Sequence, residues 1–490
     1  MTRHMAKFVR LLPLLALAAC TANPATGEQS FTAFMSLEQE LRVGAEEHPK
    51  ILKEFHGEYG ELKLRAYIRH IGKKLAAFSE LLDLTYRFTI LNDESVNAFA
   101  LPGGYVYVTR GLLALAENEA EVAGVLAHEI GHITARHTAQ RYSTATATNI
   151  GVQVLGVLGS AAGIPSAVGQ AVSFGAQAAL QSYSRHQELE ADMLGVRYMT
   201  RAGYDPDATT SFFHKLGAHS KLEAQQKGTT KVKHNIMSTH PRTEDRIKQA
   251  IELAHTTPVA RPNLGREAYL DQIDGMVFGD DPSQGVRRGR RFMHPKLRFE
   301  FRVPPSFLML NSPARLEAFG PGKAKIVFSM AAKSKATRVG SLRDYLANDW
   351  GRGLNFGSVK QIEINGLEAA TGQAHKATRD GLRHVRLVVI RIDREHIYQF
   401  AFVTPPAETQ RLSEEFRRTT YSFRRLSALD AEAIRPLRIR LITVKPDDTR
   451  AKLAARIPFE RYTREWFDLL NSLQPGNKLT PGTRIKIVAE

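Results

Sequence analysis

Two histidines spaced four residues apart constrain this chain more than any other feature. In His128-Glu129-Ile130-Gly131-His132, the two imidazoles lie one helical turn apart and therefore on one face of a helix. Such a pair can bind one metal ion, and Glu129 is placed to take a proton from the water that the metal polarises. Two exposed histidines on an ordinary helix are the alternative. The flanking residues favour a core or a cleft, because they are mostly apolar: Val122, Val125, Leu126, Ile130 and Ile133.

A catalytic zinc site needs a third protein ligand and an open fourth position. The segment 183–192 offers candidates about fifty residues after the histidine pair. Glu188 and Asp192 are four residues apart and share one helical face. We expect Glu188 to bind the metal and Asp192 to accept the second ring N–H of a ligand histidine. His186 is the alternative third ligand.

Two further ionisable residues lie close to these candidates in the sequence. We expect one helix over 118–140, and in a straight helix His137 is turned away from the face that carries His132. A structural role is therefore predicted for His137. Glu190 lies on another face from Glu188, and solvent exposure or a salt bridge is predicted for it.

The motif His-Glu-x-x-His, followed by Ser-Arg-x-x-Glu-x-x-Ala-Asp over 184–192, resembles metallopeptidase family forty-eight. That family includes HtpX, the CaaX prenyl proteases and a periplasmic BepA/LoiP-like branch. The resemblance extends over about residues 30–255. It includes Asn-Ala-Phe-Ala-Leu-Pro-Gly-Gly at 97–104, and Ser-Thr-His-Pro at 238–241 followed by Arg246.

The resemblance implies a set of site residues. His128, His132 and Glu188 would hold one zinc ion per chain, and Glu129 would be the general base. A His-Pro histidine in the periplasmic relatives can occupy the fourth metal position and restrain activity, and His240 matches it. A loop residue that caps the following helix is the alternative for His240. Arg246 would polarise the scissile carbonyl or hold the oxyanion. The catalytic candidates are therefore Glu129, His240 and Arg246.

The excess of positive over negative charge lies entirely in the C-terminal part of the chain. Residues 1–284 hold 28 Lys and Arg against 30 Asp and Glu, whereas residues 285–490 hold 39 against 20. We predict an α+β protein. A mainly helical zincin-type peptidase domain with a small sheet occupies 20–260, and a linker follows at 261–285. A basic α+β domain of unknown role is predicted at 286–425, and a LysM-like module at 437–490.

The last unit resembles a LysM module through the apolar strand 439–444, Asp447-Asp448-Thr449 and the Pro-Gly before Ile485. LysM modules bind glycans that contain N-acetylglucosamine, such as peptidoglycan. A small docking module is the alternative. The basic domain before it fits peptidoglycan or another anionic envelope component, and nucleic acid is excluded as a partner of a secreted chain.

The N-terminus is typical of a secreted lipoprotein. Arg3, Lys7 and Arg10 precede the short apolar run 11–19, which ends at Cys20, the single cysteine of the chain. We predict a lipoprotein signal peptide over 1–19, lipidation of Cys20, and attachment to the outer membrane on its periplasmic side. An ordinary signal peptide is the alternative. The uncharged segment 143–184 is predicted to form two packed helices that cover the site or touch the membrane.

These features predict a zinc-dependent endopeptidase of the bacterial envelope. Its substrates would be misfolded or misassembled envelope proteins. The alternative is a chaperone-like or glycan-binding scaffold whose metal site is largely idle. The intact Glu129 favours the enzyme, because a degenerate peptidase is expected to lose its general base.

Overall fold

The chain consists of two compact units, each described here by itself. The computed structural model describes residues 20–148, 182–227, 236, 240, 246, 249, 252, 256, 259, 261–312 and 314–490. One unit is Met1–Phe278 with Arg438–Ala489, and the other is Gly279–Leu437 with Glu490. The predicted signal peptide and residues 149–181 of the uncharged segment lie outside the described residues. Among the described helices, none combines the length and the apolarity that crossing a membrane requires.

A small three-stranded sheet forms the base of the first unit. Strand β5 (Tyr105–Thr109) lies in the middle, parallel to β3 (Arg87–Leu91) and antiparallel to β4 (Ala98–Leu101). All residues of β4 and β5 are buried, which explains why both strands are apolar along their whole length. Thr109 ends β5 and caps the short helix α4 (Arg110–Leu115), which leads directly to the helix with the histidine pair.

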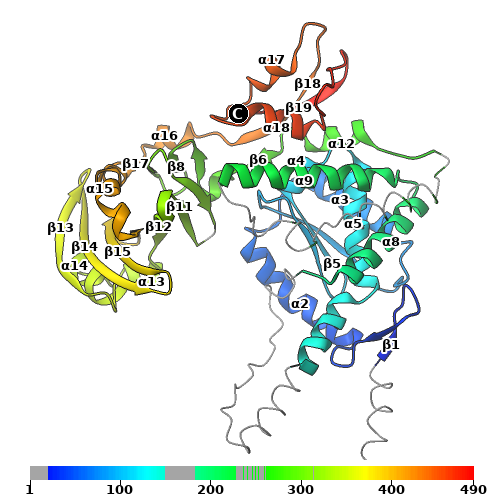
Figure 1. Ribbon diagram of the computed structural model, residues 1–490, viewed down its shortest axis with the longest axis horizontal. Coiled ribbons are helices and arrows are strands. Elements are labelled where there is room, and N and C mark those ends of the chain that lie inside the picture. The colour runs from blue at the N-terminus through cyan, green and yellow to red at the C-terminus, as the bar shows by residue number, and fades with distance from the viewer. Residues whose placement is uncertain are drawn as a thin grey trace, which may run out of the picture. The chain divides into compact units, whose positions relative to one another are not determined.

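Helix α5 (Glu119–Thr134) carries the histidine pair through the centre of this unit (Figure 1). Asn118 begins it by accepting a hydrogen bond from the backbone N–H of Glu121. All residues from Ala120 to Thr134 are buried, because the helix packs against β4 and three helices. These helices are α3 (Leu62–Ala76), α8 (Arg185–Arg201) and α9 (Asp207–Lys227).

Two glycines allow α5 and α8 to approach closely. A Cβ atom on Gly131 would lie 3.0 Å from the carbonyl oxygen of Ala191, and one on Gly195 would lie 3.1 Å from the backbone nitrogen of His128. Larger residues at these positions would push the two helices apart. The close approach brings the segment around Glu188 to the histidines.

The predicted helix over 118–140 is wrong at its end. Helix α5 ends at Thr134, and Arg136 has a left-handed backbone conformation with φ of 56° before residues 137–148 continue as helix. The guanidinium of Arg136 donates to the carbonyl oxygen of Met35 at 2.8 Å and to Glu40 Oε1 at 3.1 Å. These distant contacts stabilise the break, which an isolated sequence window does not show.

The N-terminal residues of the first unit form a hairpin and a helix. Strands β1 (Cys20–Ala22) and β2 (Gln29–Phe31) pair antiparallel, and α2 (Leu37–Glu54) follows with Ser36 as its capping residue. Arg136 joins this segment to the end of α5, because Met35 and Glu40 belong to it.

The linker predicted over 261–285 contains regular secondary structure. It contains α12 (Arg266–Ile273) and β6 (Val277–Phe278), and Tyr269, Leu270 and Ile273 are fully buried. The apolar pattern of α12 is short and is followed by a stretch rich in glycine, aspartate and arginine, so the sequence alone favours a linker.

The C-terminal segment packs in the first unit. Strands β18 (Leu437–Thr443) and β19 (Arg484–Ala489) form a sheet with β6, and α17 (Arg450–Ala454) and α18 (Thr463–Leu470) lie between them in the chain. Lys486 is buried and its Nζ donates to the carbonyl oxygens of Ala114, Leu115 and Ala116 at 3.0, 3.3 and 2.7 Å. The segment therefore caps the end of α4 next to the start of α5.

The second unit is built on a seven-stranded antiparallel sheet in the order β10-β11-β12-β16-β15-β14-β13. Helix α15 (Pro406–Tyr421) packs on its long strands, and a four-stranded sheet of β17, β9, β8 and β7 adds to the core. The whole chain thus combines helices with several sheets, as predicted. The strands of the large sheet are Leu308–Asn311, Arg315–Phe319, Lys325–Met330, Ile397–Thr404, Gly381–Arg391, Leu367–Thr378 and Phe356–Ile364 in that order. The strands of the small sheet are Arg424–Arg425, Phe299–Arg302, Arg291–His294 and Val286–Arg288.

Candidate metal centre

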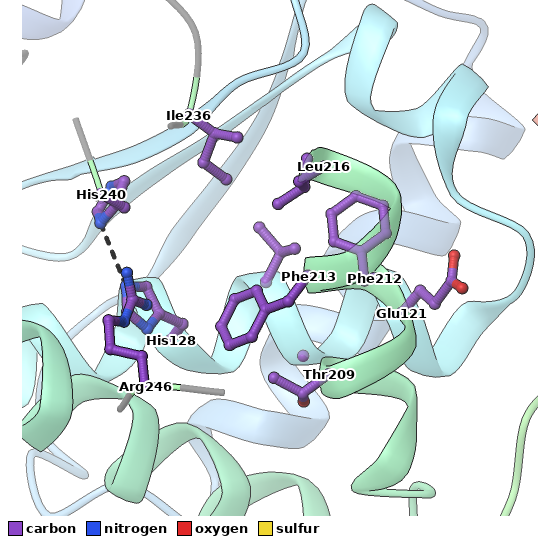
Figure 2. Close-up of a pocket in the computed structure, with 11 residues that line it drawn as sticks. Glu121, His128, Thr209, Phe212, Phe213, Leu216, Ile236, His240 and Arg246 are labelled. Atoms are coloured by element: carbon purple, nitrogen blue, oxygen red, sulfur yellow. Dashed lines mark hydrogen bonds between the residues drawn. The ribbon is translucent and has the colours of Figure 1, made fainter. Parts of the chain in front are cut away.

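Four buried side chains meet in the first unit with the spacing of a metal site. They are His128 and His132 of α5, Glu188 of α8, and His240, and their donor atoms all lie within 4.8 Å of one another. His128 Nε2 lies 3.0 Å from His132 Nε2. It lies 3.2 Å from His240 Nδ1, the contact drawn as a dashed line in Figure 2. His240 Nδ1 lies 3.0 Å from Glu188 Oε1. Zinc–nitrogen bonds of about 2.0–2.1 Å in a tetrahedron place donor atoms roughly 3.3 Å apart, so the four groups fit one ion.

The chemistry of the cluster fits zinc. Three imidazoles and one carboxylate are ligands that zinc accepts. Both carboxylate oxygens of the neighbouring Glu129 are buried, and neither accepts a hydrogen bond within the described residues. Because an unpaired buried carboxylate is costly, a cation beside it would stabilise this arrangement.

A carboxylate and an arginine orient the first ligand. His128 Nδ1 lies 2.9 Å from Asp192 Oδ1, so its other ring nitrogen faces the cluster. Arg246 donates to Asp192 from Nε at 2.6 Å and from Nη2 at 2.7 Å, and its Nη1 lies 2.6 Å from Glu188 Oε2. Burial raises the pKa of Asp192, but the hydrogen bond and the charge of Arg246 outweigh it and lower the pKa. Arg246 therefore pairs with two carboxylates of the site, those of Asp192 and Glu188.

The second ligand has a different set of neighbours. His132 Nδ1 lies 2.7 Å from His137 Nδ1, and His137 Nε2 lies 3.0 Å from Glu190 Oε2. The ring of Tyr183 stacks on His132 with 3.8 Å between the ring centroids. The expectation that His137 is turned away from His132 is wrong, because the helix breaks at Arg136 and redirects the chain. Glu190 is not exposed to solvent; it accepts a hydrogen bond from His137 Nε2, and because burial lowers the pKa of His137, this hydrogen bond takes the place of the predicted salt bridge.

His240 bridges the cluster and the candidate base. Its Nδ1 lies among the ligand atoms, whereas its Nε2 lies 3.3 Å from Glu129 Oε1. Burial lowers the pKa of His240, but the carboxylates of Glu188 and Glu129 outweigh it and raise the pKa. Burial also raises the pKa of Glu129, which the charge of His240 partly offsets. His240 thus covers one side of Glu129.

An apolar pocket opens beside the cluster. Figure 2 shows Phe212, Phe213 and Leu216 of α9 together with Ile236 around this pocket, with His128 and His240 at one end. The remaining polar lining includes Glu121, which pairs with Lys215 Nζ at 3.0 Å. The pocket fits an apolar side chain held next to the metal ligands.

A model described as Peptidase family M48 matches residues 63–254, which include the whole cluster. Residues 63–254 therefore match the M48 peptidase family. The chain is 32% identical over 256 residues to a putative beta-barrel assembly-enhancing protease of Vibrio cholerae. The aligned region covers 50% of this chain and 51% of that protein.

Two other relatives match a similar region. The beta-barrel assembly-enhancing protease of Escherichia coli is 30% identical over 194 residues, or 38% of each chain. The mitochondrial metalloendopeptidase OMA1 of Schizosaccharomyces pombe is 30% identical over 237 residues, which is 46% of this chain and 64% of that one. The chain therefore spans about half the length of the first of these relatives.

Among the candidate residues from the sequence, the structure brings most together and leaves one outside the site. His128, His132, Glu188 and His240 meet, with Glu129, Asp192 and Arg246 beside them. His186 is exposed and does not belong to the cluster. Sequence reasoning missed Tyr183 as a neighbour of His132, although Tyr183 directly precedes the Ser184-Arg185 pair of the motif.

Proposed function

We propose that the chain is a zinc-dependent endopeptidase of the bacterial envelope that degrades misfolded or misassembled envelope proteins. The observation that carries this proposal is a buried four-ligand cluster with the buried carboxylate of Glu129 beside it, whose oxygens accept no hydrogen bond within the described residues. The names of the relatives support proteins as substrates, and two of them support β-barrel assembly as the context. The test is cleavage of an unfolded protein such as casein before and after removal of the metal.

The residues of the site divide the chemistry of peptide hydrolysis. Zinc supplies Lewis acidity and lowers the pKa of a bound water toward about 7. Glu129 takes the proton from the attacking water and delivers it to the leaving amine. Arg246 holds Asp192 and Glu188 in place, which favours an orienting role over direct contact with the scissile carbonyl. The apolar pocket receives the side chain next to the scissile bond.

His240 is proposed to restrain the site. Its Nδ1 occupies the fourth ligand position and its Nε2 faces Glu129, so a substrate carbonyl and the attacking water are both excluded while it stays. We expect His240→Ala to raise the basal rate of casein cleavage. If the open state holds about 1–10% of the population, the increase is about tenfold or more.

The sign of the change separates two roles for His240. Zinc content measured on the same sample should remain at that of the wild type, because three protein ligands are left. A fall in the rate with zinc retained would contradict restraint and show instead that His240 stabilises the oxyanion.

Lipid attachment at Cys20 is proposed to hold the protein at the periplasmic face of the outer membrane. The support is the position of the single cysteine directly after the apolar run 11–19. We expect Cys20→Ser to move the protein from the membrane fraction to the soluble periplasm, as measured by fractionation and immunoblotting. Continued sedimentation with membranes would contradict the proposal and direct attention to the uncharged segment 143–184.

The released Cys20→Ser protein also tests the proposed glycan partner. The excess of positive charge lies in residues 285–490, and the LysM-like segment belongs to this part of the sequence. We expect the released protein to cosediment with isolated peptidoglycan in a salt-dependent manner. If it stays in the supernatant at low salt, the C-terminal part does not bind this glycan.

A further inference from the structure

The ring of His132 is held by a chain of hydrogen bonds that ends on a carboxylate. Glu190 carries only acceptor atoms when ionised, so the 3.0 Å contact with His137 Nε2 requires that His137 Nε2 carries a proton. In a neutral His137 the other nitrogen, Nδ1, is then an acceptor. His132 Nδ1, at 2.7 Å, must donate to it. This leaves the lone pair of His132 Nε2 directed to the other ligands.

The opposite proton arrangement conflicts with the ligand cluster. If His137 carried protons on both nitrogens, His132 Nδ1 would have to accept, and its own proton would sit on Nε2. That proton would point at His128 Nε2, which lies 3.0 Å away, and His132 could not bind a metal. The hydrogen-bond chain therefore selects the one tautomer of His132 that fits the cluster.

The hairpin that follows Cys20 fixes the carboxylate at the end of this chain. Asn23 Nδ2 donates to Glu190 Oε1 at 2.6 Å, and Thr26 Oγ1 lies 3.3 Å from the same oxygen. Asn23 is buried, and it also closes the turn between β1 and β2 by accepting from the backbone of Gly27 at 2.8 Å. One carboxylate oxygen thus faces the hairpin and the other faces His137.

The two ligand histidines of α5 are oriented by different parts of the chain. His128 is held by Asp192 and Arg246, which belong to the peptidase motifs. His132 is held through His137 and Glu190 by the hairpin, which lies outside the matched M48 region at 63–254. The outer end of the His132 chain therefore lies only three residues from Cys20.

We propose that His137 and Glu190 are positioning residues that set the tautomer and orientation of His132, and that Asn23 in the N-terminal hairpin holds Glu190 for this role. The proposal rests on the proposed metal site. It makes the segment next to Cys20 part of the support of that site, so removal or displacement of the hairpin weakens metal binding.

The test is zinc affinity, measured on purified mature protein by competition with a coloured chelator. Glu190→Ala and His137→Leu should each lower the affinity about 10- to 100-fold, the usual effect of losing an outer partner of a ligand. The double variant should be no weaker than the weaker single variant, since both act through one chain. His137→Gln keeps one acceptor and one donor and should recover part of the loss. Asn23→Ala should fall between wild type and Glu190→Ala.

A matched control removes a different carboxylate that pairs with an arginine of the same unit. Glu58 Oε2 accepts from Arg65 Nη1 at 2.9 Å, and none of the described contacts of these two residues involves the His132 chain or the hairpin, so Glu58→Ala should keep wild-type zinc affinity. The melting temperature of each metal-free variant reports folding separately. Zinc affinities of Glu190→Ala and His137→Leu within about twofold of wild type, in folded protein, would overturn the proposal. If these variants lose zinc affinity but the zinc-loaded wild-type protein cleaves no casein, the proposal stays intact and the peptidase function is contradicted instead.

Discussion

Replacing Glu129 with glutamine is expected to lower casein cleavage at least ~10²-fold while the protein keeps its metal. The amide has the shape of the carboxylate but cannot take a proton from water at neutral pH. Glu129 is not a member of the ligand cluster, so zinc binding does not depend on it directly. The measurement is the initial rate of casein cleavage, with zinc content determined on the same sample.

Stability provides the control for this variant. The Glu129 oxygens accept no hydrogen bond within the described part of the chain, so the substitution removes no such bond of the fold. The substitution weakens the contact of Glu129 Oε1 with His240 Nε2 at 3.3 Å but also removes the cost of burying a carboxylate, so the melting temperature of the metal-free protein should change little. Turnover close to that of the wild type would contradict the role of Glu129 as the general base.

Helical spacing was sufficient to predict two pairs of site residues, whereas His240 was predicted only from the family resemblance. His128 and His132 are separated by one turn, and Glu188 and Asp192 are separated by one turn of another helix. Helical geometry alone gives each pair a shared face. The meeting of the two helices depends on Gly131 and Gly195, whose role appears only when the neighbouring backbone is known.

The role of His137 could not be predicted in this way. Its contact with His132 requires a left-handed residue at Arg136, a conformation that arginine seldom adopts. The contacts that fix Arg136 come from Met35 and Glu40, about one hundred residues earlier in the chain. Sequence periodicity reports local structure, and it contains no information on such distant contacts.

The same limit applies to the C-terminal segment. The pairing of β18 with β6 joins residues that lie about 160 positions apart in the sequence, and Gly275 donates to the carbonyl oxygen of Ile439 at 2.8 Å. The charge of Lys486 predicts an exposed residue, yet its Nζ is buried against the end of α4. The alternating apolar residues of β18 and β19 allow both strands to be predicted from the sequence, whereas their pairing with β6 cannot be predicted in this way.

Replacing Glu188 with alanine is expected to remove the metal and, with it, the activity. Its Oε1 lies 3.0 Å from His240 Nδ1 and 3.5 Å from His132 Nε2, so it closes one side of the cluster. The guanidinium of Arg246, whose Nη1 contacts Glu188, would then keep only Asp192 as a carboxylate partner beside the three histidines. We expect zinc to fall from one ion per chain to less than about a tenth of that value. The control is His186→Ala on the same helix, which should keep its zinc because His186 is exposed.

The most direct test of the account measures zinc content and casein cleavage in parallel on the mature wild-type protein. The protein is treated with a chelator, the chelator is removed, and zinc is then added back in steps. We predict that cleavage disappears with the metal and returns in proportion to zinc bound, up to one ion per chain, whereas Glu188→Ala stays inactive throughout. Casein cleavage that persists at the wild-type rate in the metal-free protein would contradict a zinc-dependent peptidase.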